Sequence, residues 1–304
     1  MSADTRPAAV IRRTSGRLPR LVSVVIPTYN ATATLGAQLD ALDGQDYQGP
    51  VEVVVSDNGS TDGLPQALAG RTSTLPVRRV DASDRRGVSH ARNVGVREAS
   101  GDLILICDAD DVVAPGWVSA MVAAAADADL VGGPLDPSVI NDGSDVAWRF
   151  PHPPDRLPVK LRFLPYAHGC NVGVWRDVVD AIGGWDETYG PGGEDVDFAW
   201  RLQLAGGRLV NVPAAVVHYR HRTGVRGLAR QMAGYAEADV LLYRRFRADG
   251  ARRRSTTAAL RDVWWLASRS VLTGRPDVRG LWMNRAGQLW GRVRGSWRYR
   301  VYYP

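Results

Sequence analysis

The sequence has few cysteines, a single lysine and no long apolar run. Two cysteines in 304 residues, Cys107 and Cys170, exclude a disulfide framework and a cysteine-rich metal site, and they favour a reducing compartment. No stretch approaches the roughly 18 to 20 apolar residues that a membrane-spanning helix needs. A secretory signal requires an apolar segment after its basic residues, and no such segment follows the first arginines. We therefore expect a cytoplasmic protein. The sequence also contains no internal repeat and no low-complexity segment.

The composition is that of a globular protein with an uneven distribution of charge. Hydrophobic residues make up 45% and charged residues 23% of the chain, enough for one large α/β domain with an appendage or for two domains. Residues 226–304 hold 17 arginines and 5 acidic residues, a net charge of about +12, which leaves about −6 for the preceding part of a chain whose total is +6. The carboxy-terminal part is therefore strongly basic.

Apolar runs and helical patterns alternate along the first half of the chain. β-branched or apolar runs predict strands over 22–26, 51–55, 77–80 and 103–107. Helices are predicted over 32–42 and 117–126, and the segment 85–95 is predicted to open a helix that runs to about residue 99. This alternation indicates a parallel sheet with crossover helices. A later helix is predicted over 195–204 and a strand over 209–217. Residues 1–20 are polar and rich in arginine, serine and proline, and we expect them to be disordered.

Three carboxylates follow the apolar run 103–107 in the segment GDLILICDADD: Asp108, Asp110 and Asp111. Open α/β sheets bind ligands at the carboxyl ends of their strands. If the strand continues, Asp108 and Asp110 project to the same side. Clustered carboxylates repel unless a cation neutralises them, and Mg²⁺ or Mn²⁺ prefers such ligands. The alternative is that these aspartates are turn and N-cap residues before the next helix.

The basic segment 226–304 combines an apolar helical face with interleaved tryptophan and arginine. Tryptophan favours the membrane interface and basic clusters favour anionic lipids, so this segment is one candidate for contact with an anionic membrane surface. The alternative is a helical extension that packs on the preceding domain with a solvated basic face. No recognised nucleic-acid-binding module is present, and we expect no nucleic-acid partner.

Four motifs in a fixed order resemble family 2 glycosyltransferases of the bacterial, non-processive type, which have the GT-A fold. They are VSVVIPTYN, SDNGSTD, RGVSHARNVG leading into DADD, and GGWDE with GGED. The resemblance spans about residues 21–221. It implies a Rossmann-like mixed sheet flanked by helices, the nucleotide-diphospho-sugar transferase fold. The domains expected are a disordered segment 1–20, a GT-A domain 21–225 and a helical extension 226–304.

The resemblance also implies which residues hold a nucleoside diphosphate sugar: Pro27, Thr28, Tyr29, Asp57, Arg86 and Asp108. Asp57 would contact the base, although Asx-turn chemistry alone also explains it. Relatives often have a second aspartate where this chain has Asn58. Arg85 is the alternative to Arg86 as the contact to the diphosphate, which an arginine can bind in bidentate fashion.

By the same resemblance, Asp110 ligates the metal, Mg²⁺ or Mn²⁺, and His218 supplies a further metal ligand, with His221 as the competing candidate. A histidine at the end of a strand is also a common structural residue. Asp195 of GGED matches the catalytic base of the family, and a carboxylate is the kind of group that can take a proton from an acceptor hydroxyl. An alternative role is capping a helix N-terminus.

Four residues are expected on the acceptor side: Glu194, Trp185, Asn171 and His168. The function predicted is inverting, metal-dependent transfer of a sugar to a hydroxyl of a carbohydrate or lipid-linked acceptor, for cell-envelope or surface glycan synthesis. Because a processive Q-x-x-R-W signal is absent, we expect one sugar per event.

Two alternative functions were considered for the same sequence. A nucleotidylyltransferase would show a glycine-rich phosphate loop after the first strand, which PTYNATATLG lacks. A non-catalytic nucleotide-sugar-binding scaffold at the membrane would lack the D-x-D or the base, and both are present.

Overall fold

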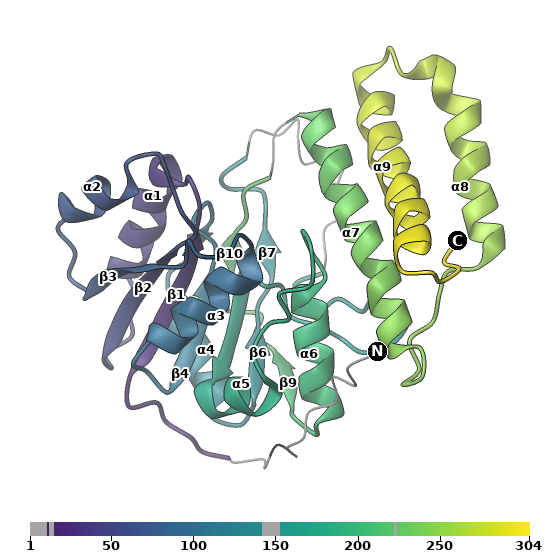
Figure 1. Cartoon of the computed structure of the whole chain (residues 1–304). Helices are drawn as coiled ribbons and strands as arrows, with labels where there is room; N and C mark the ends of the chain where they lie inside the picture. Colours follow the sequence, from purple (N-terminus) through teal and green to yellow (C-terminus); the bar gives the residue numbers. More distant parts are fainter. Residues whose placement is uncertain (1–10, 12–14, 142–152, 222–223) are drawn as a thin grey trace.

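A seven-stranded mixed sheet with helices on both faces forms the body of the protein (Figure 1). The structure is a computed structural model and describes residues 11, 15–141, 153–221 and 224–304. The strands of this sheet, in chain order, are β1 (Val22–Thr28), β2 (Val51–Asp57), β3 (Val77–Asp81), β4 (Leu103–Cys107), β6 (Leu130–Gly132), β8 (Asn171–Trp175) and β9 (Leu209–Asn211). Their spatial order is β3-β2-β1-β4-β8-β6-β9. β1 runs parallel to β2 and β4, whereas β8 runs antiparallel to β4 and β6, so the predicted mixed sheet is confirmed.

Helices follow most of the strands, as the alternating pattern predicted. They are α1 (Thr32–Asp43), α2 (Leu64–Ala69), α3 (Val88–Glu98), α4 (Trp117–Ala125), α5 (Arg176–Ile182), α6 (Glu194–Leu204), α7 (Val225–Phe246), α8 (Thr256–Arg269), the 3₁₀ turn η1 (Ser270–Leu272) and α9 (Pro276–Arg298). None of the helices described is long and apolar enough to span a bilayer.

Strand β4 lies at the centre of the sheet, and all five of its residues are buried. Val24 of β1 pairs with Leu105 of β4, so the two side chains lie on the same face of the sheet. A side chain at Gly173 would meet Leu105 and Met121 of α4, so α4 covers this face. A side chain at Gly95 of α3 would meet Val25, so α3 covers the opposite face. Burial on both sides explains the continuous apolar run of β4.

A small second sheet forms beside the carboxyl end of β4. It consists of β5 (Val112–Val113), β10 (Val217–His218) and β7 (Leu135–Asp136), with β10 in the middle. The single strand predicted over 209–217 is wrong: β9 pairs with β6 in the main sheet, whereas β10 pairs with β5 and β7 in the small one. The chain changes sheets between them, and β10 therefore reaches the region where β4 ends.

Helix α7 joins the carboxy-terminal extension to the body of the protein. Phe246 packs edge-to-face on Trp200 of α6, with ring centroids 5.2 Å apart. Arg245 forms ion pairs with Asp186 at 2.6 Å and Asp197 at 3.2 Å. The first helix of the extension is thus integrated into the sheet-bearing body by apolar and charged contacts.

Helix α9 lies between α7 and α8 (Figure 1). Side chains at Gly287 and Gly291 would overlap the backbone carbonyls of Ala229 and Ala233 on α7. These glycines, one turn apart, therefore let the two helices pack backbone to backbone.

The amino-terminal segment differs from the predicted disorder in the part that the structure describes. Residues 1–10 and 12–14 lie outside the described residues. The Arg17 guanidinium lies 3.9 Å from the Trp175 ring centroid and pairs with Asp177 at 3.1 Å, and its backbone N–H donates to the carbonyl of Ala126. The polar, arginine-rich composition predicted disorder, but an aromatic face and a carboxylate on the body contact Arg17 in this stretch.

Candidate active site

An open pocket of about 440 Å³ lies where β1 ends and α3 begins. Its lining residues are Pro27, Thr28, Tyr29, Asn58, Arg86, Gly87, Val88 and Ala91. Four of the six predicted nucleotide-binding residues therefore line one cavity. The Arg86 guanidinium lies 4.5 Å from the ring centroid of Tyr29, which is 53% exposed. An exposed aromatic face beside a cation suits a ligand that combines a flat base with phosphate.

Asn58 shapes one wall of this pocket. Its Nδ2 donates to the backbone carbonyls of Ala82 at 2.6 Å and Arg85 at 2.7 Å, and its Oδ1 accepts from the Gly87 N–H at 2.9 Å. Gly87 has φ +140°, a value that L side chains rarely adopt. An aspartate at this position has no N–H to donate to the two carbonyls. The asparagine that departs from the family pattern therefore holds the loop before α3.

Asp57 and Arg85 do not line the pocket. Asp57 is fully buried, accepts from Ser60 N–H at 2.8 Å and pairs with Arg79 at 2.7 Å. Burial raises its pKa, but the hydrogen bonds from Ser60 and Arg79 outweigh burial and hold the pKa below its ordinary value. Arg85 pairs with Glu187 at 2.9 Å. Of the two candidate arginines, Arg86 is the one beside the cavity.

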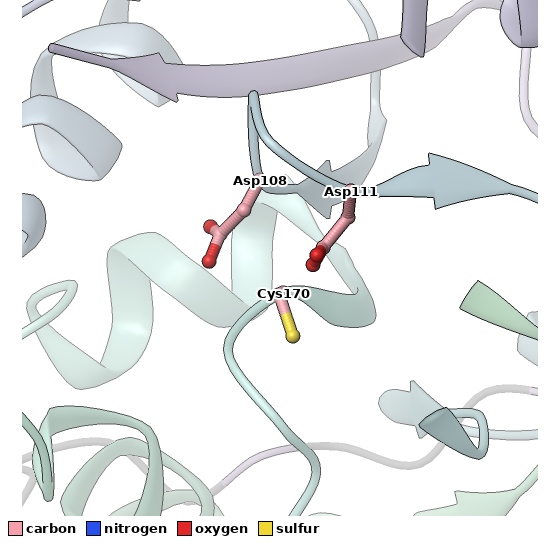
Figure 2. A group of neighbouring side chains, drawn as sticks. All are labelled: Asp108, Asp111 and Cys170. Atoms are coloured by element: carbon pink, nitrogen blue, oxygen red, sulfur yellow. The ribbon is translucent and has the colours of Figure 1, made fainter. Parts of the chain in front are cut away.

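Asp108, Asp111 and Cys170 form a second group of side chains near the end of β4 (Figure 2). Each offers one ligand atom, and these atoms lie within 4.8 Å of one another. Strand β4 ends at Cys107 and the chain turns, so Asp111 rather than Asp110 comes beside Asp108. Asp110 is exposed, and its carbonyl oxygen accepts from Arg220 Nε at 2.8 Å. Asp108 and Asp110 were expected to project to the same side only if the strand continued through them, and β4 ends before both.

The charges of this group are poorly compensated. Burial, then the neighbouring acids Asp110 and Glu194, raise the pKa of Asp108 to about 6 against the opposing effect of Arg92. Burial, then Asp108, raises the pKa of Asp111 to about 9. Asp108 Oδ1 and Asp111 Oδ2 are buried and lack a hydrogen-bond partner within the described ranges. Two buried carboxylate oxygens without a hydrogen bond, one of them 3.6 Å from the Arg92 guanidinium, lie beside a thiol, and this donor set fits a divalent cation. Between the two expected ions, the sulfur favours Mn²⁺ over Mg²⁺.

His218, the second predicted metal ligand, lies on β10 in the small sheet. Its Nδ1 is 3.5 Å from Asp136 Oδ2 on β7, and it is not a member of the group of Asp108, Asp111 and Cys170. His221, the competing candidate, is buried, with its ring 5.4 Å from that of Tyr219. The structure therefore gives both histidines neighbours of their own.

Arg92 connects the carboxylate group to the start of α6. Its side chain is 3% exposed; Nη1 donates to Glu194 Oε1 at 2.8 Å, and Nη2 lies 3.6 Å from Asp108 Oδ1. This arginine lies within the motif RGVSHARNVG, and no role was predicted for it from the sequence. Arg92 lies between Ala91 and Val94, which are both buried, so its position in the sequence could have indicated a cation on the inner face of α3.

Asp195 lies in the first turn of α6, after Gly193, whose φ is +91°. Asp195 is half-buried, and its Oδ2 accepts from the Gly169 N–H at 3.3 Å. The positive end of the helix dipole favours a carboxylate there. Burial, then the charge of Asp195, raises the pKa of Tyr235 on α7. The extension thus contributes a tyrosine to the surroundings of Asp195, which the sequence did not reveal.

Glu194 is buried and faces Arg92, whereas Asp195 is the more accessible carboxylate of the pair. Burial, then the adjacent Asp195, raises the pKa of Glu194, and Arg92 opposes this rise. His168 is half-buried, with its ring 5.7 Å from that of Tyr166.

Two of the predicted acceptor-binding residues belong to the core, which corrects the sequence interpretation. Trp185 is 2% exposed and stacks on Phe198, with ring centroids 4.1 Å apart and planes 3° from parallel. Asn171 is fully buried; it accepts from Trp117 Nε1 and donates to the carbonyls of Pro134 and Ala215. Neither side chain is accessible to an acceptor in this conformation, because each is engaged inside the fold.

Comparisons with known proteins agree with this geometry. A family model described as "Glycosyl transferase family 2" matches residues 23–183. The pre-mycofactocin glycosyltransferase of Mycobacterium tuberculosis is 29% identical over 74% of this chain and 48% of its own length. The N-acetylglucosaminyl-diphospho-decaprenol L-rhamnosyltransferase of the same organism is 29% identical over 63% of this chain and 74% of its own. This chain therefore spans about half the length of the first of these relatives.

Solved structures show the same fold at low sequence identity. The mannosyltransferase PcManGT from Pyrobaculum calidifontis, in complex with GDP-Man and Mn²⁺, is 22% identical with a TM-score of 0.62, over 95% of this chain and 90% of its own. S. aureus TarS 1-349, in complex with UDP-GlcNAc, is 18% identical with a TM-score of 0.52, over 93% of both chains. The chain belongs to glycosyl transferase family 2, a family of enzymes, and has the GT-A fold.

Proposed function

We propose that this protein transfers a sugar from a nucleoside diphosphate donor to a hydroxyl acceptor with inversion of the anomeric configuration. The observation that carries the proposal is the pocket lined by Pro27, Thr28, Tyr29 and Arg86, four residues that the sequence resemblance assigns to the donor site. Stacking on Tyr29 would hold the base, and Arg86 would contact the diphosphate. The solved complexes of similar proteins with GDP-Man and UDP-GlcNAc support a nucleotide-sugar donor.

Asp195 is the proposed general base. It is more accessible than the adjacent Glu194, which Arg92 holds by a hydrogen bond of 2.8 Å. Asp195 would accept the proton of the acceptor hydroxyl as that oxygen attacks the anomeric carbon, and the nucleoside diphosphate would leave from the opposite face. Inversion follows from this single displacement. Glu194 would orient this end of α6. His168 would lie with it on the acceptor side.

Asp108 and Asp111, with the Cys170 sulfur, would hold a divalent cation, and Mn²⁺ is the favoured ion because one ligand atom is sulfur. When bound, such a cation would offset charge on the diphosphate leaving group. Asp110 is exposed next to this group and is retained as a candidate ligand for an ion bound together with the donor, whereas His218 would need to leave Asp136 to join it.

The acceptor is proposed to be a carbohydrate or a lipid-linked glycan of the cell envelope. The rhamnosyltransferase named above acts on a decaprenol-linked substrate, as its name states, and supports this class. We propose that residues 21–225 form the transferase domain and 226–304 an extension, and that the protein works in the cytoplasm at the inner face of the membrane.

Donor turnover tests the proposal directly. Purified protein with Mn²⁺ is incubated with UDP-, GDP- and dTDP-sugars, and release of nucleoside diphosphate is followed. Asp195→Asn keeps one of the two carboxylate oxygens that accept from the Gly169 and Val196 N–H groups, and it should lose about 10²–10⁴ in turnover. Asp249→Asn, an exposed aspartate on the α7–α8 connection, is the control. Unchanged turnover in Asp195→Asn would exclude Asp195 as the general base. If the protein binds none of the nucleotides, the proposed glycosyltransferase function is excluded.

A further inference from the structure

The hairpin of α8 and α9 carries most of the large apolar side chains that are exposed in the part of the chain that the structure describes. Within the described residues, fourteen such side chains are exposed, and nine of them lie in residues 252–304, about a sixth of the chain. They are Leu260, Val263, Trp264, Val271, Leu272, Trp290, Val293, Trp297 and Tyr302, here called the hairpin face. Trp297 is 84% and Trp264 69% exposed. Scattered exposed apolar residues are ordinary, whereas a cluster marks an interaction surface.

Much of the hairpin face forms one continuous surface. A groove of about 440 Å³ between α8 and α9 has Leu260, Val263, Val293, Trp297 and Tyr302 among its lining residues. Trp264 lies one helical turn after Leu260, and Trp290 lies three and seven residues before Val293 and Trp297, so both extend the same stripes. α9 turns its glycines toward α7, and α8 is the outermost helix (Figure 1). The exposed fractions of its side chains show that the rest of the described protein leaves the hairpin face uncovered.

The hairpin is strongly basic as well as apolar. Residues 252–304 contain twelve arginines and two acidic residues, a net charge of +10. Asp262 already pairs with Arg254 at 2.9 Å and Arg292 at 3.0 Å, so few acidic groups remain to neutralise the other arginines. Arg261 on α8 and Arg279 on α9 are exposed. A second copy of this chain would bring a surface of the same sign, whereas anionic lipid headgroups bring the opposite one.

We propose that the hairpin face binds the surface of an anionic lipid bilayer. The three exposed tryptophans, Trp264, Trp290 and Trp297, would enter the interfacial region, where amphipathic rings are favoured, while the arginines contact headgroup phosphates. Neither helix crosses the bilayer in this arrangement; both lie along it. The inference deepens the proposed function by naming the surface at which a lipid-linked acceptor would be met, but the binding itself does not depend on turnover.

Vesicle sedimentation of the full chain tests this. Vesicles of phosphatidylcholine alone are compared with vesicles that also contain phosphatidylglycerol, at low and high salt. The protein should bind the anionic vesicles, and salt should weaken binding. Arg261→Gln should lower the affinity about fivefold, the equivalent of about 1 kcal/mol for one arginine near the surface. Arg156→Gln, an exposed arginine on the body, is the matched control and should bind like the wild type.

Replacing both Trp264 and Trp297 with alanine tests the apolar part of the contact. These side chains are exposed, so the variant should keep the wild-type melting temperature while losing vesicle binding even at low salt. Binding unchanged by the double variant, or equal on neutral and anionic vesicles, would overturn the proposal. Absence of vesicle binding together with a concentration-dependent dimer that the double variant abolishes would identify the face as an interface between copies.

Donor turnover, measured without vesicles, separates the two proposals. If the protein turns over the donor but does not bind vesicles, only the proposal for the hairpin face is overturned. If the protein binds vesicles but does not turn over any donor, only the proposed transferase function is overturned.

Discussion

Arg92 offers the sharpest test of how the active site is held together. Its guanidinium is 3% exposed and Glu194 is 8% exposed, so their 2.8 Å ion pair is shielded from solvent. Breaking a buried pair by removing one partner typically costs about 3–5 kcal/mol, because the remaining charge is left uncompensated. Arg92→Met keeps most of the side-chain volume, and we expect the free energy of unfolding to fall by that amount, with the melting temperature about 10 °C lower.

The control lies on the same helix. Arg97→Met removes an exposed arginine of α3 and should change the free energy of unfolding by less than about 0.5 kcal/mol. The measurement is urea unfolding, followed by circular dichroism, for both single variants and for the double variant Arg92→Met with Glu194→Gln.

The double variant distinguishes a lost charge partner from lost packing. If the destabilisation comes from the stranded carboxylate of Glu194, neutralising it should recover a large part of the loss, giving a coupling energy of about 1–3 kcal/mol. If the two substitutions simply add, or if Arg92→Met costs less than about 1 kcal/mol, the assigned role of Arg92 is wrong.

Three further results are expected. Gly291→Ala should lower the melting temperature because its methyl group would overlap a backbone carbonyl of α7, whereas Gly274→Ala, where a side chain meets open space, should not; calorimetry measures both. Burial alone would raise the pKa of Asp186, but the hydrogen bonds that it accepts from Thr188 and Arg245 outweigh burial and lower that pKa. The stabilisation from Asp186 is therefore complete above about pH 4 and is lost as the pH falls below that. The loss of unfolding free energy in Arg245→Met should shrink over the same interval, and a loss that stays constant with pH would refute this. Cys170→Ser should weaken binding of Mn²⁺ more than of Mg²⁺ in titration calorimetry, and equal loss would exclude sulfur as a ligand.

The strands β1, β2, β3 and β4 could be predicted because their cause is local. The run 103–107 is apolar at every position, and only a strand covered on both faces buries all of it. The grouping of Pro27, Thr28 and Tyr29 in one pocket could be expected for a related reason: these residues end or directly follow a strand, and the carboxyl ends of parallel strands gather at one edge of the sheet.

The carboxylate group could not be predicted in the same way. Whether Asp110 or Asp111 lies beside Asp108 depends on a turn of two residues after β4, and that turn is imposed by pairing of β5 with β10, more than a hundred residues later in the chain. Asn171 was misassigned for a similar reason. A polar residue amid glycines indicates a binding site, but its three hydrogen-bond partners come from distant segments that only the fold brings together.

The proposed boundary between residues 225 and 226 coincides with a change of composition. α7 begins there, yet one part of this helix places Arg245 on Asp186 and Asp197 of the body, and another places Tyr235 within the electrostatic reach of Asp195. The same helix receives the glycine face of α9. The hairpin is therefore joined to the surroundings of the proposed base through one continuous helix, so a bilayer bound at the hairpin face would lie at a fixed orientation to the acceptor side of the active site.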